Sequence, residues 1–159
     1  MNVLPSYTVS AHADITVESP RRRILLVVEC QLARNVEEAT ETRRTLLGEG
    51  YLNVPDDAFF MLAFSTEFYL WKPQCAIDSL PTLIAPGRPL LREYLGARNA
   101  DQVPWPLKEN VELGISCWLR DLANGMRKPD PTSDADQMIV KSGLYELIKG
   151  GVVQTDVPT

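Results

Sequence analysis

Polar and apolar residues alternate along residues 7–18. This period of two is typical of a β-strand with one buried face. Ser19 and Pro20 then give a turn signal, and the continuously apolar residues 23–30 predict a second strand that is buried on both faces. We expect the two strands to form an antiparallel hairpin. The apolar face of the first strand consists of Val9, Ala11, Ala13, Ile15 and Val17, and its polar face of Thr8, Ser10, His12, Asp14 and Thr16.

A helical period replaces this alternation after the second strand. Asn35 is a candidate N-cap, and Glu38 stands three residues later, where the acid of a capping box belongs. Gly48 or Gly50 is expected to end the helix, because glycine accepts the left-handed conformation that often follows a helix. The apolar stripe of this helix consists of Val36, Ala39, Leu46 and Leu47.

Two further strands are predicted at residues 58–64 and 67–71, and the second is rich in aromatic side chains. Residues 73–102 hold four prolines and are expected to be irregular, apart from a short helix at residues 90–95. The middle of the chain therefore adds strands to the hairpin before a long irregular connection.

Long helices are predicted for residues 106–124 and 134–149, because apolar residues recur there at helical spacing and glycines follow. The strands thus precede the long helices in the chain. This order predicts an α/β fold in which a strand-rich N-terminal half forms a mixed β-sheet flanked by helices.

The composition fits one globular domain, since the chain has 159 residues of which 45% are hydrophobic and 23% are charged. We expect residues 7–72 to form its central part and residues 73–159 a mainly helical part packed on it. No apolar run approaches the ~18 residues of a membrane span, and no secretion signal is recognisable. The three cysteines and the single histidine are scattered, which suits a protein of the reducing cytoplasm without a zinc site or a disulfide framework.

The net charge of −5 argues against strong, non-specific binding of DNA or RNA by the whole surface. It leaves room for local basic clusters, of which residues 21–23 and 43–44 are the densest. A nucleic-acid substrate or partner would therefore have to bind at a defined site.

The second predicted strand ends in an unusual group of polar residues, Glu29-Cys30-Gln31. Glu29 and Gln31 point to the same side of a strand, while Cys30 points to the other side and is expected to pack as a small apolar residue. Across the hairpin, the first strand carries a second carboxylate, Asp14. Two facing carboxylates make an oxygen-lined site of the kind that binds Mg²⁺ or Mn²⁺.

The order of acid, hairpin, apolar strand, Glu-x-Gln, helix and strand resembles the PD-(D/E)xK (restriction-endonuclease-like) nuclease superfamily over residues 7–72. The resemblance implies a restriction-endonuclease-like core, with Asp14 and Glu29 as the metal ligands for Mg²⁺. It also implies Mg²⁺-dependent hydrolysis of phosphodiester bonds in DNA or RNA. Gln31 stands where the superfamily has a lysine that orients or activates the attacking water.

Gln31 changes the chemistry that the resemblance implies. A side-chain amide brings no positive charge to the phosphate and is no acid near neutral pH, although it still orients a water. Arg43 shares a helix face with Val36 and Ala39, so we expect it to point at the sheet as a helix-borne substitute. The candidate catalytic residues are therefore Asp14, Glu29, Gln31 and Arg43.

An alternative is a catalytically inactive nuclease-fold protein that acts as an interaction or accessory subunit of a larger bacterial assembly. The acidic net charge and Glu-x-Gln favour this alternative, whereas the presence of both acids favours the nuclease. A third possibility, an unrelated α/β scaffold, requires Asp14 and Glu29 to lie far apart. His12, two residues before Asp14, is either a further metal ligand or proton carrier or, as is more common, an ordinary half-buried histidine. The sequence leaves the oligomeric state open.

Overall fold

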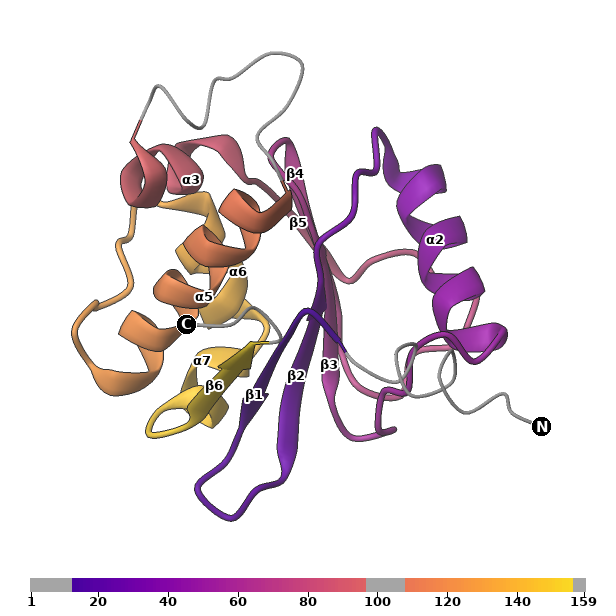
Figure 1. The fold of residues 1–159 in the computed structure, drawn as a ribbon, viewed down its shortest axis with the longest axis horizontal. Helices are drawn as coiled ribbons and strands as arrows, with labels where there is room; N and C mark the ends of the chain where they lie inside the picture. The colour runs from indigo at the N-terminus through magenta and orange to yellow at the C-terminus, as the bar shows by residue number, and fades with distance from the viewer. Residues whose placement is uncertain (1–12, 97–107, 156–159) are drawn as a thin grey trace.

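A computed structural model of the protein describes residues 13–96 and 108–155. Six strands form one mixed sheet in the order β5-β4-β3-β2-β1-β6 (Figure 1). The strands β2 and β3 are parallel, and every other neighbouring pair is antiparallel. The strands are β1 (Ile15–Glu18), β2 (Ile24–Glu29), β3 (Phe59–Ala63), β4 (Glu67–Trp71), β5 (Leu83–Pro86) and β6 (Val152–Thr155).

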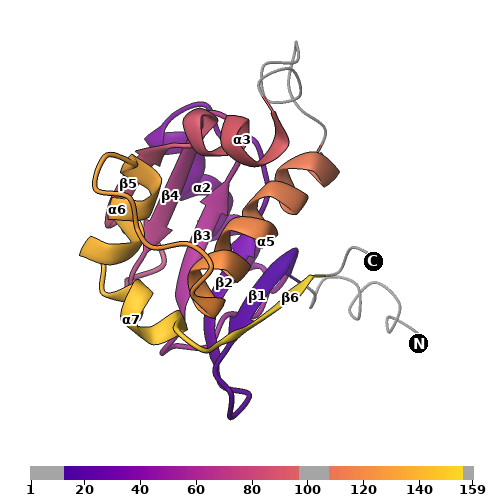
Figure 2. The same cartoon turned by 90° about the vertical axis from the view of Figure 1, so that its left-hand side faces the viewer.

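The helices cover both faces of the sheet, so the fold has three layers (Figure 1). Figure 2 looks onto the face that carries α3, α5, α6 and α7, while α2 is the one described helix on the opposite face. The predicted α/β class, a mixed sheet flanked by helices, is confirmed. The described helices are α2 (Val36–Gly48), α3 (Arg88–Leu95), α5 (Lys108–Asn124), α6 (Asp134–Lys141) and α7 (Leu144–Ile148).

Each face of the sheet has its own hydrophobic core. Under α2, the rings of Phe60 and Trp71 lie 5.7 Å apart. On the other face, Phe68 and Trp118 of α5 pack with their ring centroids 5.7 Å apart. The side chain of Trp118 is fully buried. Strands buried on both faces thus explain the continuous apolar runs in the sequence.

The predicted antiparallel hairpin of β1 and β2 is present, with Ile15 opposite Val28. Ile15 and Val17 are fully buried, as the alternation predicts, and Thr16 between them is half-buried. The described strand is shorter than predicted because Ala13 and Asp14 precede it in irregular structure. Residues 7–12 of the predicted strand, His12 among them, lie outside the described residues.

The predicted N-terminus of α2 is confirmed. The side chain of Asn35 accepts a hydrogen bond from the backbone N–H of Glu38 at 2.8 Å. The carboxylate of Glu38 accepts a hydrogen bond from the backbone N–H of Arg34 at 3.0 Å. In a capping box this carboxylate would accept from the N–H of the N-cap residue itself, which is one residue later. The helix ends at Gly48, and Gly50 takes the left-handed conformation (φ 77°).

The second half of the chain adds two strands that the sequence did not predict. β5 lies within residues 73–102 and pairs with β4, and β6 pairs with β1 at the opposite edge of the sheet. Both strands have four residues and border prolines or glycines, so their apolar pattern is too short to be read. The prediction that residues 73–102 are irregular apart from one helix was therefore wrong at β5.

The predicted helix at residues 134–149 is in fact two helices, α6 and α7. Gly143 separates them in a left-handed conformation (φ 86°), which ends one helix and starts the next. The other predicted long helix corresponds to α5, which ends where predicted, before Gly125. None of the described helices is both long enough and apolar enough to cross a membrane.

Candidate functional site

Asp14 and Glu29, the two predicted metal ligands, lie next to each other. Asp14 directly precedes β1, and Glu29 is the last residue of β2. Because the two strands are antiparallel with Ile15 opposite Val28, Asp14 falls opposite Glu29. The backbone N–H of Asp14 donates to Oε1 of Glu29 at 3.3 Å. The fold thus brings both carboxylates to one end of the hairpin.

Asp14 is buried, with 4% of its surface exposed, although it belongs to the polar face of the predicted alternation. Its Oδ2 accepts a hydrogen bond from the backbone N–H of Cys30 at 2.8 Å. Its Oδ1 accepts a second one from Nζ of Lys108 at 3.1 Å. Each carboxylate oxygen therefore has a donor, which offsets the cost of burying the charge.

Lys108 is the residue that the sequence analysis missed. It is the first described residue of α5, and its Nζ also lies 3.8 Å from Oε1 of Glu112, one turn further along the helix. Burial disfavours its charge, but the hydrogen bond to Asp14 and the charges of Asp14, Glu112 and Glu29 outweigh this and raise the pKa of Lys108. A lysine is unfavourable near a helix N-terminus, because the helix dipole is positive there. A lysine at the start of a predicted helix was therefore the signal in the sequence that could have pointed to Lys108.

The electrostatic surroundings of Glu29 strongly disfavour its charged form. Burial first, and then the negative charge of Asp14, raise the pKa of Glu29 to about 7. The N–H of Asp14, the charge of Lys108 and a hydrogen bond with the Gln31 side chain act in the opposite direction and only partly offset this. Glu29 consequently changes its charge close to neutral pH.

Cys30 and Gln31 occupy opposite sides of the end of β2. Cys30 is fully buried in the core under α5, as predicted, and burial raises the pKa of its thiol well above the usual value. Gln31 faces α2 and lines an open hollow of about 350 Å³ together with Tyr51. Gln31 therefore stays beside Glu29, within reach of a molecule bound in that hollow.

Arg43 lies away from Asp14 and Glu29. It points at the sheet as predicted, but its guanidinium stacks over Trp71 of β4, 5.1 Å from the ring centroid. β4 is two strands away from β2, and Trp71 lies opposite Phe60 near the start of β3, whereas Glu29 lies opposite Leu62. Nothing in the described structure joins Arg43 to the candidate site, so we no longer assign it a part there.

The donors at the candidate site are hard oxygens, which suit Mg²⁺ or Mn²⁺. Within residues 13–96 and 108–155, no group of three or more His, Cys, Asp and Glu residues is arranged to hold a metal ion. Asp14 and Glu29 alone match the one or two carboxylates with which proteins commonly bind Mg²⁺, the other ligands being waters and substrate oxygens. The residues present are therefore compatible with such an ion.

Comparisons of this chain with protein-family models, with curated proteins and with solved structures found no match. The geometry of the chain brings Asp14, Glu29 and Gln31 together, adds Lys108 and Glu112, and places Arg43 elsewhere, over Trp71.

Proposed function

We propose that this protein is a nuclease of the PD-(D/E)xK type that hydrolyses phosphodiester bonds in DNA or RNA with the help of Mg²⁺. The observation that carries the proposal is the cluster of Asp14, Glu29 and Lys108. Two carboxylates adjoin at the end of a hairpin, and an ammonium group lies 3.1 Å from one of them. These are the groups that the hydrolysis of a charged diester requires.

Asp14 and Glu29 would hold the metal ion. When bound, Mg²⁺ supplies charge neutralisation for the phosphate and a more acidic water. Glu29 binds a cation only in its deprotonated form, so its pKa of about 7 links metal binding to pH. Asp14 is fixed by the N–H of Cys30, which keeps one carboxylate in place before the ion arrives.

Lys108 would supply the positive charge that Gln31 lacks. Its ammonium group is held at the site by Asp14 and Glu112, and its side chain is 45% exposed, so a substrate phosphate is able to approach it. A positive charge fixed in advance stabilises the charge that develops on the phosphate during hydrolysis. Gln31, hydrogen-bonded to Glu29, would orient the attacking water through its amide.

The test combines metal binding with cleavage. Mg²⁺ and Mn²⁺ are titrated calorimetrically into the wild type, Glu29→Ala and Lys108→Met, and each protein is assayed on single- and double-stranded DNA and RNA. We expect Glu29→Ala to lose both metal binding and cleavage. Lys108→Met should keep metal binding but lose cleavage by about 100-fold or more. A wild type that neither binds metal nor cleaves any of the four substrates would contradict the proposal.

One observation favours the second candidate function, a catalytically inactive interaction or accessory subunit. Lys108 already neutralises Asp14, as a metal ion would. If Lys108 takes the place of a metal ion, the wild type binds no Mg²⁺. Lys108→Met then gains affinity for Mg²⁺, because two carboxylates are left without a cation. Metal binding that appears only in Lys108→Met would therefore favour a protein partner over a nucleic-acid substrate.

A further inference from the structure

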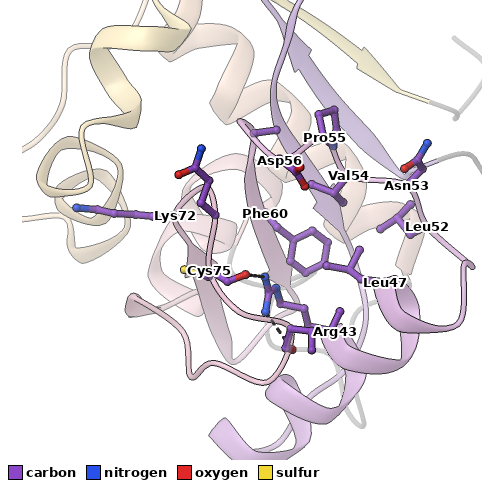
Figure 3. A pocket seen from close by; sticks show the side chains of 13 residues that line it. Arg43, Leu47, Leu52, Asn53, Val54, Pro55, Asp56, Phe60, Lys72 and Cys75 are labelled. Carbon is purple, nitrogen blue, oxygen red and sulfur yellow. Dashed lines mark hydrogen bonds between the residues drawn. The ribbon is translucent and has the colours of Figure 1, made fainter.

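A second pocket lies under α2, at a distance from the candidate site. It has a volume of about 240 Å³ and is enclosed by α2, the loop before β3 and the chain that follows β4 (Figure 3). Its walls combine polar and apolar side chains, and Arg43 forms part of them. The apolar lining comes mainly from Leu47, Leu52, Val54, Pro55, Phe60 and Ile77.

Arg43 is buried in this wall, with 5% of its surface exposed. Its Nη1 donates to the carbonyl oxygens of Ala76 at 2.9 Å and Ile77 at 3.2 Å, and its Nη2 donates to that of Cys75 at 3.4 Å. A guanidinium has five N–H groups, so three are used and two remain. Nε is one of these two, and it is buried with no hydrogen-bond partner among the described residues.

The charge of Arg43 is also without a counter-ion in the part of the chain that the structure describes. Its described partners are three neutral carbonyls and the ring of Trp71, and no carboxylate of residues 13–96 or 108–155 forms an ion pair with it. Burial lowers the pKa of Arg43, which shows that its surroundings disfavour the charge. A buried charge is costly unless an opposite charge compensates it.

The other charged residues at the pocket do not fill this role. In Figure 3, Lys72 extends away from Arg43, and Asp56 lies on the other side of the pocket beside Val54 and Pro55. The pocket therefore combines a buried cation that no described carboxylate compensates with a group of apolar side chains. Such a pairing suits a ligand whose charge and apolar surface are at different ends.

We propose that this pocket binds a small organic carboxylate with an apolar body. The carboxylate supplies the missing counter-charge to the guanidinium of Arg43, which forms part of the pocket wall. The body of the ligand contacts Phe60 and Leu47. The volume of about 240 Å³ limits the ligand to a molecule of roughly the size of benzoate or hexanoate.

This proposal does not depend on nuclease activity. Arg43 and Phe60 lie on the α2 face near the start of β3, whereas Asp14 and Glu29 lie at the far end of β2. Failure of the cleavage assays would leave the pocket proposal standing. Failure of ligand binding would likewise leave the metal site untouched.

The first experiment titrates benzoate and hexanoate into the ¹⁵N-labelled wild type and follows amide chemical shifts. Benzyl alcohol and 1-hexanol serve as uncharged analogues of nearly the same shape. We expect saturable shifts at Leu47, Phe60 and Ile77 with the two carboxylates, and binding of the alcohols about tenfold weaker or worse. Absence of saturable binding by both carboxylates would overturn the proposal, as would equal binding of the alcohols.

The second experiment compares two variants that each remove one positive charge from the same pocket. Arg43→Gln should weaken benzoate binding by about tenfold or more, because it removes the charge that attracts the carboxylate. Lys72→Gln should change it by less than about twofold, since the exposed amine points away. The opposite ranking of the two variants would overturn the assignment to Arg43.

Arg43→Gln also removes hydrogen bonds that hold residues 75–77, so it changes the pocket wall as well as the charge. A third measurement therefore uses the wild type alone. Cys75 lines the pocket and is half-buried, so iodoacetamide should alkylate it more slowly when benzoate is bound. Cys117 of α5, also half-buried, is the internal reference and should react at an unchanged rate. Equal rates at Cys75 with and without saturating benzoate would contradict binding in this pocket.

Discussion

Lys108 donates a hydrogen bond to Oδ1 of Asp14 at 3.1 Å, although the two residues are 94 positions apart. The contact joins the start of α5 to the start of β1. It places a cation beside a buried carboxylate, which in turn holds the backbone of Cys30 at the end of β2. One lysine thus contributes both to the fold and to the chemistry proposed for the site.

Replacing Lys108 by Met should lower the free energy of unfolding by about 1–2 kcal/mol, because Asp14 then keeps its buried charge with one donor fewer. This loss of free energy is smaller than for a fully buried ion pair, since the lysine side chain is 45% exposed. Urea denaturation followed by circular dichroism measures the change.

Lys149→Met is the matched control for this variant. Lys149 forms an ion pair of the same length, 3.1 Å, with Glu146, but both side chains are largely exposed. We expect its loss to cost less than about 0.5 kcal/mol. Equal costs for the two lysines would mean that the burial of Asp14 adds nothing to the pair with Lys108.

The raised pKa of Glu29 makes stability depend on pH. Between its ordinary value of 4.5 and about 7, the folded state binds the proton of Glu29 more tightly than the unfolded chain does. The free energy of unfolding should therefore fall as the pH rises through this range, by about 3 kcal/mol, and level off above it. Denaturation curves at intervals from pH 5 to 8 measure this slope.

Glu29→Gln should lack this part of the slope and be more stable than the wild type at pH 8, because no charge is left to desolvate. Glu109→Gln removes an exposed carboxylate from α5 and should keep the wild-type slope. Added Mg²⁺ should stabilise the wild type above pH 7 and leave Glu29→Gln unaffected. A wild-type slope retained in Glu29→Gln would refute the assignment.

The two acids should differ in their effect on stability. From the sequence, repulsion between like charges at an empty site predicts that replacing either by Ala leaves stability equal or higher. The structure supports this for Glu29 only. Asp14→Ala leaves the buried N–H of Cys30 without its acceptor and Lys108 without its hydrogen-bond acceptor, so it should cost about 2–3 kcal/mol. Thermal denaturation of Asp14→Ala and Glu29→Ala side by side tests this difference.

Arg43→Gln should be less stable than the wild type by about 1–3 kcal/mol, because three carbonyl groups lose their donor and Trp71 loses its cation. If the protein cleaves nucleic acids, the rate of the folded variant should stay within about twofold of wild type, since Arg43 is remote from Asp14 and Glu29. A loss of cleavage as large as that of Lys108→Met would return Arg43 to the list of catalytic candidates.

The sequence predicts those parts of the fold that depend on neighbouring residues. The hairpin, β4 and the start of α2 are recognisable because their signals are local: alternation, a continuous apolar run, and a side-chain cap at Asn35. The adjacency of Asp14 and Glu29 follows from the same hairpin. Local patterns were therefore enough to identify half of the candidate site.

The remaining features depend on contacts between distant segments. β5 and β6 become strands because β4 and β1 offer them an edge, and their four-residue sequences carry too little pattern to show it. Helical spacing gave the direction of Arg43 correctly, but it does not tell over which strand the helix lies. Lys108 reaches Asp14 only after α5 has packed on the sheet, which no local pattern predicts.

The pairing of β1 with β6 has a consequence for the timing of synthesis. A chain is made from its N-terminus, so β1 acquires β2 early but keeps an open edge until residues 152–155 emerge from the ribosome. The ammonium group that completes the Asp14 cluster comes from residue 108 and is equally late. A nascent chain of this protein therefore carries both acids without their cation, and any action on nucleic acid begins only after most of the chain has been translated.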